Sequence, residues 1–307
     1  VVILTYNEEI HIERAIRSVR SLAKDILVVD SFSTDSTVAL AEEAGARVIQ
    51  HTFVNQAQQF QWAIDNGNVS APWILRLDAD EIIEPDLARV LAEQVPLLPS
   101  DVVGINLCRK HIFLGRWIRR GGRYPLLMLR LFRRGHGRVE DRWMDEHIVI
   151  WGGTAVTFPG GFADANERDL TYFTAKHNAY ATREAIDVLL DRYALGRVDR
   201  TLTTQNTSRQ AHVKRWFKQN LYNRLPLWAA PTAYFLFRYI VQLGFLDGRE
   251  GLIYHVLQGF WYRFLVAAKT LELERAIKPL TTPGERIAEL GRLTGYDLSG
   301  LTQAGNR

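Results

Sequence analysis

Three carboxylates occupy four positions directly after a short apolar segment. Trp73–Leu77 has the composition of a buried strand, and Asp78, Asp80 and Glu81 follow it. Open α/β sheets bind their ligands beyond the carboxyl ends of the strands. The oxygens of Asp-x-Asp, two residues apart, suit a hard divalent cation that also binds phosphate. Because surface turns are also rich in Asp, the pattern predicts a metal site only together with the segments around it.

Strands and helices alternate along the chain that leads to these carboxylates. Apolar runs predict strands over residues 1–5, 26–29, 47–50 and 73–77. Apolar residues at helical spacing predict helices over 10–22, 38–44 and 56–66, the second ended by Gly45. Strands that alternate with helices of this length form βαβ units around a mostly parallel sheet. We therefore expect an α/β fold.

Six polar residues come just beyond the carboxyl ends of these predicted strands. They are Asn7, Glu8, Asp30, Asp35, Asp78 and Asp80. Each of them alone is an ordinary helix cap or turn former. All six on one edge of a parallel sheet favour a binding site for a polar ligand.

Three segments of the chain resemble family 2 glycosyltransferases of the GT-A fold. They are Thr5-Tyr6-Asn7-Glu8-Glu9, Val28-Val29-Asp30-Ser31 with the following Ser33, Thr34, Asp35 and Ser36, and Leu77-Asp78-Ala79-Asp80-Glu81. Three later segments resemble the bacterial subgroup that includes lipopolysaccharide-core β-1,4-glucosyltransferases: Gly121-Gly122 with Tyr124-Pro125, Leu129–Arg134, and Gly244–Gly248. The likeness extends to about residue 270, more loosely after residue 150.

The resemblance implies a fold and a division of the chain. A GT-A fold is Rossmann-like, with a mostly parallel central sheet flanked by helices. We expect this nucleotide-sugar-binding and catalytic domain at residues 1–165. A helical C-terminal region is expected at residues 166–307, where it would contact an acceptor, a membrane surface or a second subunit.

The resemblance also assigns the residues of a donor site. Nucleotide-sugar contacts are expected from Thr5, Asn7, Glu8, Asp30, Gln59, Arg76 and Asp78, with Gln58 as a further contact. If the base is uracil, Asp30 would accept a hydrogen bond from its imide. Asp80 is the expected ligand of Mn²⁺ or Mg²⁺, which would stabilise charge on the leaving nucleotide. Gln59 fits a solvated helix residue equally well, and Glu81 fits an early helix residue before Pro85.

An inverting transfer needs a general base that takes the proton of the acceptor hydroxyl. Related bacterial enzymes often carry His-Glu where this chain has Asp145-Glu146, followed by His147. The resemblance maps the base onto Glu146, and the change at the preceding position leaves Asp145 as the alternative. Asp141 is a further carboxylate nearby, and all of them are also compatible with plain surface charges.

A basic, aromatic and glycine-rich segment spans residues 111–125. We expect a mobile loop over the acceptor, with its glycines as hinges. Trp117 or Tyr124 would stack on a sugar, or belong to the core. His111, Arg130 and Arg133 are candidates for binding the diphosphate or a charged acceptor.

The helical pattern after residue 165 predicts amphipathic helices over 170–195 and 209–221. The apolar segments 225–245 and 252–268 carry charges or prolines within the thickness of a bilayer core, which argues against spanning helices. Aromatic residues beside Arg and Lys favour a position in the membrane interface or against a second copy in a homo-oligomer. The alternative is that these segments pack on the catalytic domain.

The composition of the chain limits which binding partners and which cellular compartment we expect. The net charge of +4 arises from arginines gathered in the middle of the chain, and no nucleic-acid-binding motif accompanies them, so we expect no nucleic-acid partner. Sugar-nucleotide phosphates and an anionic acceptor explain these charges better. The single Cys108 fits a reducing compartment, and no signal-peptide pattern is present. We expect a cytoplasmic enzyme on the inner face of a bacterial plasma membrane, and a few N-terminal residues missing before Val1.

The sequence thus favours a metal-dependent, inverting hexosyltransferase. The donor expected is a UDP-hexose, and the acceptor a bacterial glycan or a lipid-linked acceptor of the lipopolysaccharide type. A nucleotidyltransferase is the enzymatic alternative, although the Gly-rich, basic first turn usual in that class is replaced here by Tyr6–Glu9. A catalytically silent, membrane-associated nucleotide-sugar-binding module is the other alternative.

Overall fold

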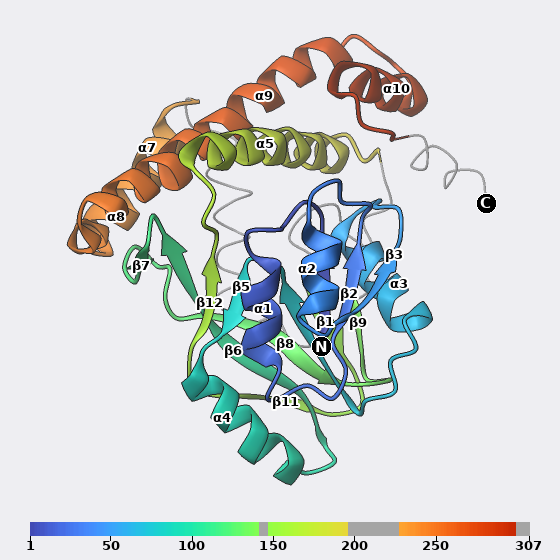
Figure 1. The fold of residues 1–307 in the computed structure, drawn as a ribbon. Helices are drawn as coiled ribbons and strands as arrows, with labels where there is room; N and C mark the ends of the chain where they lie inside the picture. Colours follow the sequence, from blue (N-terminus) through green and yellow to red (C-terminus); the bar gives the residue numbers. More distant parts are fainter. Residues whose placement is uncertain (141–146, 196–226, 299–307) are drawn as a thin grey trace. The chain divides into compact units, whose positions relative to one another are not determined.

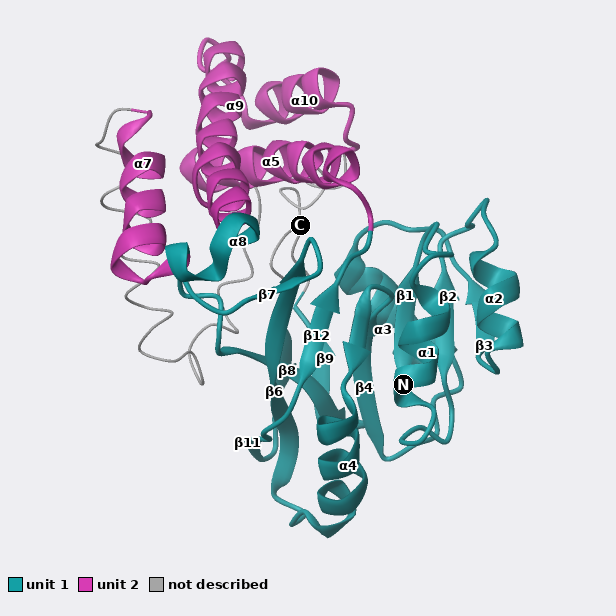
Figure 2. Ribbon diagram, turned by 60° about the vertical axis from the view of Figure 1, so that its left-hand side comes forward, with its two compact units in different colours: residues 1–167, 245–251 teal, residues 168–244, 252–307 magenta. Residues whose placement is uncertain are grey.

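The computed structural model describes residues 1–140, 147–195 and 227–298 (Figure 1). They fall into two compact units, coloured separately in Figure 2. Unit 1 comprises residues 1–167 together with 245–251, and unit 2 comprises the described residues of 168–244 and 252–307.

Unit 1 contains the strands and the helices that alternate with them. Its strands are β1 (Val2–Thr5), β2 (Leu27–Asp30), β3 (Arg47–Gln50), β4 (Trp73–Asp78), β5 (Glu81–Ile83), β6 (Val102–Phe113), β7 (Arg116–Ile118), β8 (Leu126–Arg133), β9 (Gly137–Val139), β10 (Ile148–Ile150), β11 (Thr154–Thr157) and β12 (Phe162–Ala165). Its helices are α1 (Ile12–Val19), α2 (Thr37–Glu43), α3 (Gln56–Asn66), α4 (Pro85–Gln94) and the 3₁₀ turn η1 (Val95–Leu97). The α/β fold class predicted from the sequence is confirmed.

The main sheet of the described residues runs in the order β3-β2-β1-β4-β8-β6-β12-β5. Its first half, β3-β2-β1-β4, is parallel, as βαβ units require. From β8 onward the sheet is mixed, because β8 is antiparallel to both β4 and β6. No crossover helix separates β6 from β8, so the chain returns beside β6 in the opposite direction.

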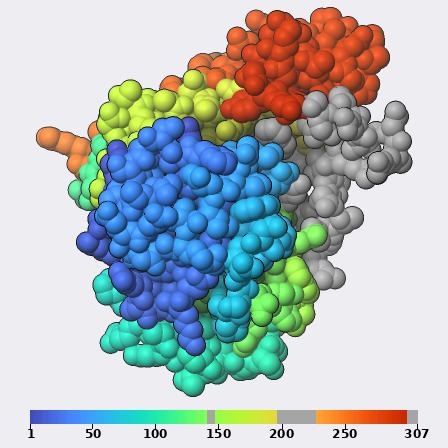
Figure 3. All heavy atoms as spheres, turned by 45° about the vertical axis from the view of Figure 1, so that its right-hand side comes forward, coloured from blue at the N-terminus to red at the C-terminus, as the bar shows by residue number. Residues whose placement is uncertain are grey.

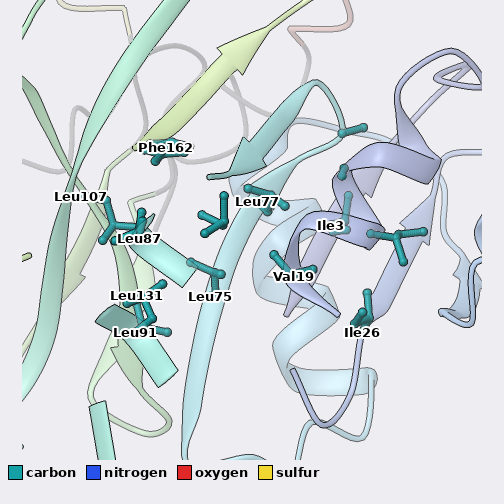
Figure 4. Close-up of a cluster of buried hydrophobic side chains, with 14 of the residues drawn as sticks. Ile3, Val19, Ile26, Leu75, Leu77, Leu87, Leu91, Leu107, Leu131 and Phe162 are labelled. Carbon is teal, nitrogen blue, oxygen red and sulfur yellow. The ribbon is translucent and has the colours of Figure 1, made fainter. Parts of the chain in front are cut away.

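Successive apolar side chains along the strands point to opposite faces of this sheet, so that both faces are covered by hydrophobic residues. In β1, Ile3 belongs to one hydrophobic cluster and Val2 to another, and Val28 and Leu27 divide in the same way in β2. The first cluster includes apolar residues of α1, α2 and α4 (Figure 4). The second cluster packs Ala57, Phe60 and Ala63 of α3 against the opposite face. Helices therefore cover the sheet from both sides, and residues of the first βαβ units form a continuous face in the space-filling view (Figure 3).

The segment expected to be a mobile acceptor loop is largely a hairpin. His111–Phe113 of β6 pair antiparallel with Arg116–Ile118 of β7. Leu114 and Gly115, with φ of 50° and 76°, form the two-residue turn that matches the twist of such strands. The loop prediction was wrong here because a two-residue turn ending in Gly also closes a hairpin. Gly121 and Gly122, with φ of 65° and 68°, lie in the turn that follows.

Helices dominate the rest of the described chain. They are α5 (Leu170–Arg192), α7 (Ala229–Leu236), the π-helical η3 (Phe237–Val241), the 3₁₀ turn η4 (Gly244–Asp247), α8 (Gly248–Tyr254), the π-helical η5 (His255–Trp261), α9 (Tyr262–Ile277) and α10 (Pro283–Thr294). The predicted helix 170–195 is confirmed as α5, whereas 209–221 lies outside the described residues. Of the helices described, none has the length and apolarity needed to cross a membrane.

Within unit 2, α5 and α9 are joined by polar contacts as well as apolar ones. Glu184 of α5 accepts from Tyr262 Oη at 2.7 Å and from Arg263 Nη1 at 2.8 Å. Arg192 Nη1 donates to Glu274 Oε2 at 2.7 Å. Ala181, Tyr262 and Val266 form a buried cluster between the two helices. Part of the apolar segment 252–268 is therefore buried against α5 within unit 2.

Candidate active site

The carboxyl ends of the parallel strands bring several of the predicted site residues to one edge. Strand register sets Thr5 beside Asp30 and Asp30 beside Gln50. On the other side of β1, Leu4 lies beside Asp78. The hydroxyl oxygen Oγ1 of Thr5 is buried and has no hydrogen-bond partner among the described residues. A buried polar atom without a partner is unfavourable, so Thr5 is suited to meet a polar ligand at this edge.

The two turns that follow β1 and β2 are joined by hydrogen bonds. The N–H groups of Asn7 and Glu8 donate to Ser33 Oγ at 2.8 Å and Thr37 Oγ1 at 2.7 Å. In return, the N–H of Thr34 donates to Asn7 Oδ1 at 2.8 Å. Asn7, with φ of 53°, adopts the left-handed conformation that Asn tolerates better than most residues. These bonds join the turns after β1 and β2 at this edge of the sheet.

Asp30 organises the second turn from within. It is fully buried, and its Oδ2 accepts from the N–H of Ser33 at 2.9 Å and from Gln50 Nε2 at 3.1 Å. Its Oδ1 accepts from the hydroxyl of Ser33. The turn and Gln50 therefore occupy three of the roughly four acceptor positions of the Asp30 carboxylate.

Gln59 and Arg76 are buried beneath the same edge. Gln59 exposes only 1% of its surface, and its Oε1 lies 2.7 Å from Nδ1 of His51. The alternative of a solvated helix residue is thus wrong for Gln59, although its neighbour Gln58 is exposed. Arg76 packs over the ring of Phe60, and its Nε lies 3.5 Å from Asp78 Oδ1.

Two arginines hold Asp78. Besides Arg76, Arg130 Nη2 lies 3.3 Å from Asp78 Oδ2 and 2.6 Å from Glu81 Oε1. Burial alone would raise the pKa of Asp78, but the positive charges of Arg130 and Arg76 outweigh it and lower the pKa to about 2. Asp78 is therefore ionised at neutral pH.

Glu81 and Arg130 form a buried pair rather than surface groups. Glu81 exposes 1% and Arg130 3% of their surfaces. Glu81 Oε2 accepts from the N–H of Asp78 at 2.9 Å, and burial raises its pKa. Glu81 lies in β5, so its alternative as an early helix residue is wrong. Arg130 Nη2 joins the carboxylates of Asp78 and Glu81 across their turn.

Asp80 is half-buried at the turn between β4 and β5. Its Oδ2 accepts from Asn166 Nδ2 at 3.0 Å. A carboxylate is a good ligand for Mg²⁺ or Mn²⁺, so the residue type fits a metal. Among the described residues, no group of three or more His, Cys, Asp or Glu is arranged to hold an ion. Asp80 would contribute a carboxylate oxygen to such an ion.

The candidate acceptor residue His111 lies near the end of β6. His111 Nδ1 lies 3.0 Å from Asp164 Oδ2, and Arg109 Nη1 lies 3.6 Å from the same oxygen. Burial lowers the pKa of His111 despite the nearby Asp164, so the imidazole is neutral at neutral pH. Arg133, by contrast, donates to the carbonyl oxygens of Val102 and Leu98 and so serves the fold.

Trp117 is surrounded by other side chains. Lys110 Nζ lies 4.8 Å and Arg119 Cζ 4.5 Å from its ring centroid. Tyr124 meets it edge-to-face at 4.9 Å. Its indole Nε1 is buried and has no hydrogen-bond partner among the described residues. Trp117 is therefore better suited to donate a hydrogen bond from Nε1 to a ligand than to stack its ring on a sugar.

The candidate bases Glu146 and Asp145, together with Asp141, lie outside the described residues.

Residues 1–158 of the chain match the family model described as glycosyl transferase family 2. The chain belongs to this family. It is 42% identical over 124 residues to an uncharacterized glycosyltransferase of Rickettsia bellii, a match that covers 36% of this chain and only 40% of that relative. It is 30% identical over 189 residues to the lipopolysaccharide core biosynthesis glycosyltransferase LpsC of Rhizobium meliloti, covering 60% of this chain and 68% of LpsC.

Among solved structures, the chain is similar to glucosyl-3-phosphoglycerate synthase from Mycobacterium tuberculosis in complex with Mn²⁺, UDP and phosphoglyceric acid. The TM-score is 0.41 at 20% identity, over 62% of this chain and 76% of that one. Fold likeness at this level does not imply a shared substrate.

Three residues that contact the candidate site were not predicted from the sequence. His11, Asp164 and Asn166 contact Glu8, His111 and Asp80, respectively. Only the first pair is close in sequence, at the i,i+3 spacing typical of side-chain pairs near a helix start. The other two pairs depend on the pairing of β12 with β6 and β5, which no sequence spacing indicates.

Proposed function

We propose that this family 2 glycosyltransferase transfers a hexose from a nucleotide sugar, with inversion and with help from a divalent metal. The donor proposed is a UDP-hexose. The acceptor proposed is a bacterial glycan or a lipid-linked acceptor of the lipopolysaccharide type, in keeping with the name of the Rhizobium meliloti relative.

One observation carries the proposal: Asp78 ends β4 and Asp80 lies in the turn just after it, at the edge where β1 presents the buried hydroxyl of Thr5. Ligands of open α/β sheets bind at such edges. The two carboxylates have different surroundings, since Asp78 is held by arginines and Asp80 by an amide. We assign Asp78 to the ribose side of the nucleotide and Asp80 to the diphosphate side.

In this proposal, the chain's own residues bind and orient the donor. Thr5, Asn7 and Glu8 form the turn that receives the nucleoside, while Asp30 and Gln59 hold the neighbouring turn after β2 through Ser33 and Ser31. Arg76 and Arg130 keep Asp78 ionised and oriented. A divalent ion held by Asp80 would neutralise charge on the departing diphosphate.

The proton of the acceptor hydroxyl requires a base on the opposite side of the sugar from the leaving group. We propose Glu146 for this role, with Asp145 as the alternative. His111 and Trp117 are proposed to line the acceptor side, His111 as a neutral imidazole and Trp117 through its indole N–H.

The donor can be identified by ligand-induced thermal stabilisation in the presence of Mn²⁺. A binder present at about 100 times its Kd stabilises the folded state by about 2.7 kcal/mol, enough to shift the unfolding temperature measurably. UDP and one or more UDP-hexoses should raise the unfolding temperature, and nucleoside diphosphates with other bases should raise it less. Equal stabilisation by all bases would rule out a uridine-specific donor site.

A further inference from the structure

The end of β12 contacts several parts of the donor edge, all within unit 1. β12 pairs antiparallel with β5, with Asp164 opposite Glu81, and the two strands lie side by side in Figure 1. Just past this pair, the N–H of Ala165 donates to the carbonyl oxygen of Asp80 at 3.0 Å. The backbone of β12 therefore holds the backbone of the Asp78–Asp80 turn.

The next residue holds the side chain of that turn. Asn166 Nδ2 donates to Asp80 Oδ2 at 3.0 Å. The two backbones are already joined by the Ala165 bond, so the Asn166 contact adds little to strand pairing. What it does restrict is the rotation of the Asp80 carboxylate. The amide is a neutral donor and so adds no charge beside that carboxylate.

The residue after Asn166 links the same strand end to the turn after β1. The N–H of Glu167 donates to Nε2 of His11 at 2.9 Å. A ring nitrogen that accepts a hydrogen bond carries no proton, so the proton of His11 lies on Nδ1 and is donated to Glu8 Oε2 at 2.5 Å. Arg14 reinforces the link through Glu167 Oε1 and the carbonyl oxygen of Ala165. Asp80 and Glu8 are thus set by consecutive residues of one segment.

We propose that Asn166 is a positioning residue for Asp80, which it orients for the metal-bound diphosphate of the donor. The inference rests on the proposed function, in which Asp80 is the metal ligand. Partners that hydrogen-bond to a metal ligand orient it and tune its affinity, and their loss typically lowers metal affinity by roughly 10- to 100-fold. Asn166 has the geometry of such a partner, and its neighbours Ala165 and Glu167 keep it in place.

The test compares the full-length wild type with Asn166→Ala and with Asn166→Leu, which is close to asparagine in shape but has no donor. Mn²⁺ affinity in the presence of saturating UDP is measured from the electron paramagnetic resonance of free Mn²⁺. UDP affinity is measured by calorimetry with Mn²⁺ and again with EDTA. Both variants should bind Mn²⁺ roughly 10- to 100-fold more weakly while their UDP affinity in EDTA matches that of the wild type.

A double-mutant cycle with Asp80→Asn separates positioning from a general structural effect. If Asn166 acts through Asp80, Asn166→Ala should cause no further loss of Mn²⁺-dependent UDP affinity in the Asp80→Asn background. An equal loss in both backgrounds, or a matching loss of UDP affinity in EDTA, would overturn the inference and leave the proposed function standing. A wild type whose UDP affinity does not depend on Mn²⁺ would overturn the metal-dependent function and this inference together.

Discussion

At the scale of single residues, charge at the donor edge is arranged by pairing. Asp78 is paired with both Arg76 and Arg130. Arg130 is also paired with Glu81. His111 and Arg109 share Asp164. Such buried networks specify geometry more than they add stability, because each charge must first leave water. The edge therefore holds a fixed pattern of acidic and basic groups at the proposed donor site.

The residue proposed as general base has a direct test. Glu146→Gln keeps the shape of the side chain and removes its basicity. We expect UDP-sugar binding to persist while transfer falls by roughly 10²- to 10⁴-fold. Binding by calorimetry and transfer rates on the same preparations separate the two effects. A near-normal rate in Glu146→Gln with a collapsed rate in Asp145→Asn would move the base to Asp145.

His111 predicts a pH dependence of stability. Its folded pKa is lowered from 6.5 by burial, so the folded state binds a proton less readily than the unfolded chain. The contribution of His111 to folding stability is therefore fully present above pH 6.5 and is lost as the pH falls below that value. Urea unfolding of the wild type between about pH 7 and pH 5 should show this loss, and His111→Gln should reduce it. His147→Gln, at an exposed histidine, is the control; an unchanged slope in His111→Gln would contradict the prediction.

At the scale of elements, the segment Phe245–Gly251 belongs to unit 1 although it lies far along the chain. Asp247 is 4% exposed, and its Oδ2 accepts from the N–H of Arg120 at 2.8 Å. Arg120 directly precedes the Gly121-Gly122 turn. This bond therefore joins two of the segments that resemble the lipopolysaccharide-core subgroup. The contact is a structural reason for both segments to occur in the same chain.

Asp247→Ala should destabilise unit 1 by about 1–3 kcal/mol, because the backbone N–H of Arg120 loses its charged acceptor. Denaturant unfolding followed by intrinsic fluorescence would measure the change. Arg249→Ala, at an exposed neighbour, is the matched control and should leave stability within about 0.5 kcal/mol. Equal stability of the two variants would show that the Asp247 contact is unimportant.

The elements that sequence reasoning located well are those with a local signal. The bounds of β3 and α3 agree with the predicted 47–50 and 56–66, because apolar spacing and flanking polar residues delimit them. The hairpin β6–β7 and the β5–β12 pair were missed, since one rests on a two-residue turn and the other on residues about eighty positions apart. Asn166 was missed for the same reason: only strand pairing brings it to Asp80.

At the scale of the whole molecule, the C-terminal cations expected to face lipid are mostly used inside unit 2. Arg238 is buried, Arg263 pairs with Glu184, and Lys269 donates to Thr182 Oγ1. The apolar residues, in contrast, are exposed on η3 and the end of α7. Leu236, Phe237, Ile240 and Val241 expose 44, 49, 55 and 66% of their surfaces. A membrane role would therefore rest on apolar insertion more than on charge.

We predict that the full-length protein floats with liposomes containing anionic lipid and that Phe237→Ser with Ile240→Ser abolishes flotation. Exposed apolar side chains on one helical segment gain most by entering the headgroup region. Val54→Ser, at an exposed apolar residue of unit 1, is the control. Light scattering on the same samples reports oligomers. A monomer that does not bind liposomes would contradict the membrane-surface location expected from the sequence.

The central claim is that Asp80 and a divalent metal together drive departure of the nucleotide. Its most direct test is the rate of UDP release from the UDP-hexose selected by thermal stabilisation. Excess EDTA should abolish release, added Mn²⁺ should restore it, and Asp80→Ala should be inactive with or without Mn²⁺. Asp65→Ala, at an exposed aspartate of α3, should behave as the wild type. Unchanged UDP release in excess EDTA, or full activity of Asp80→Ala, would contradict the account.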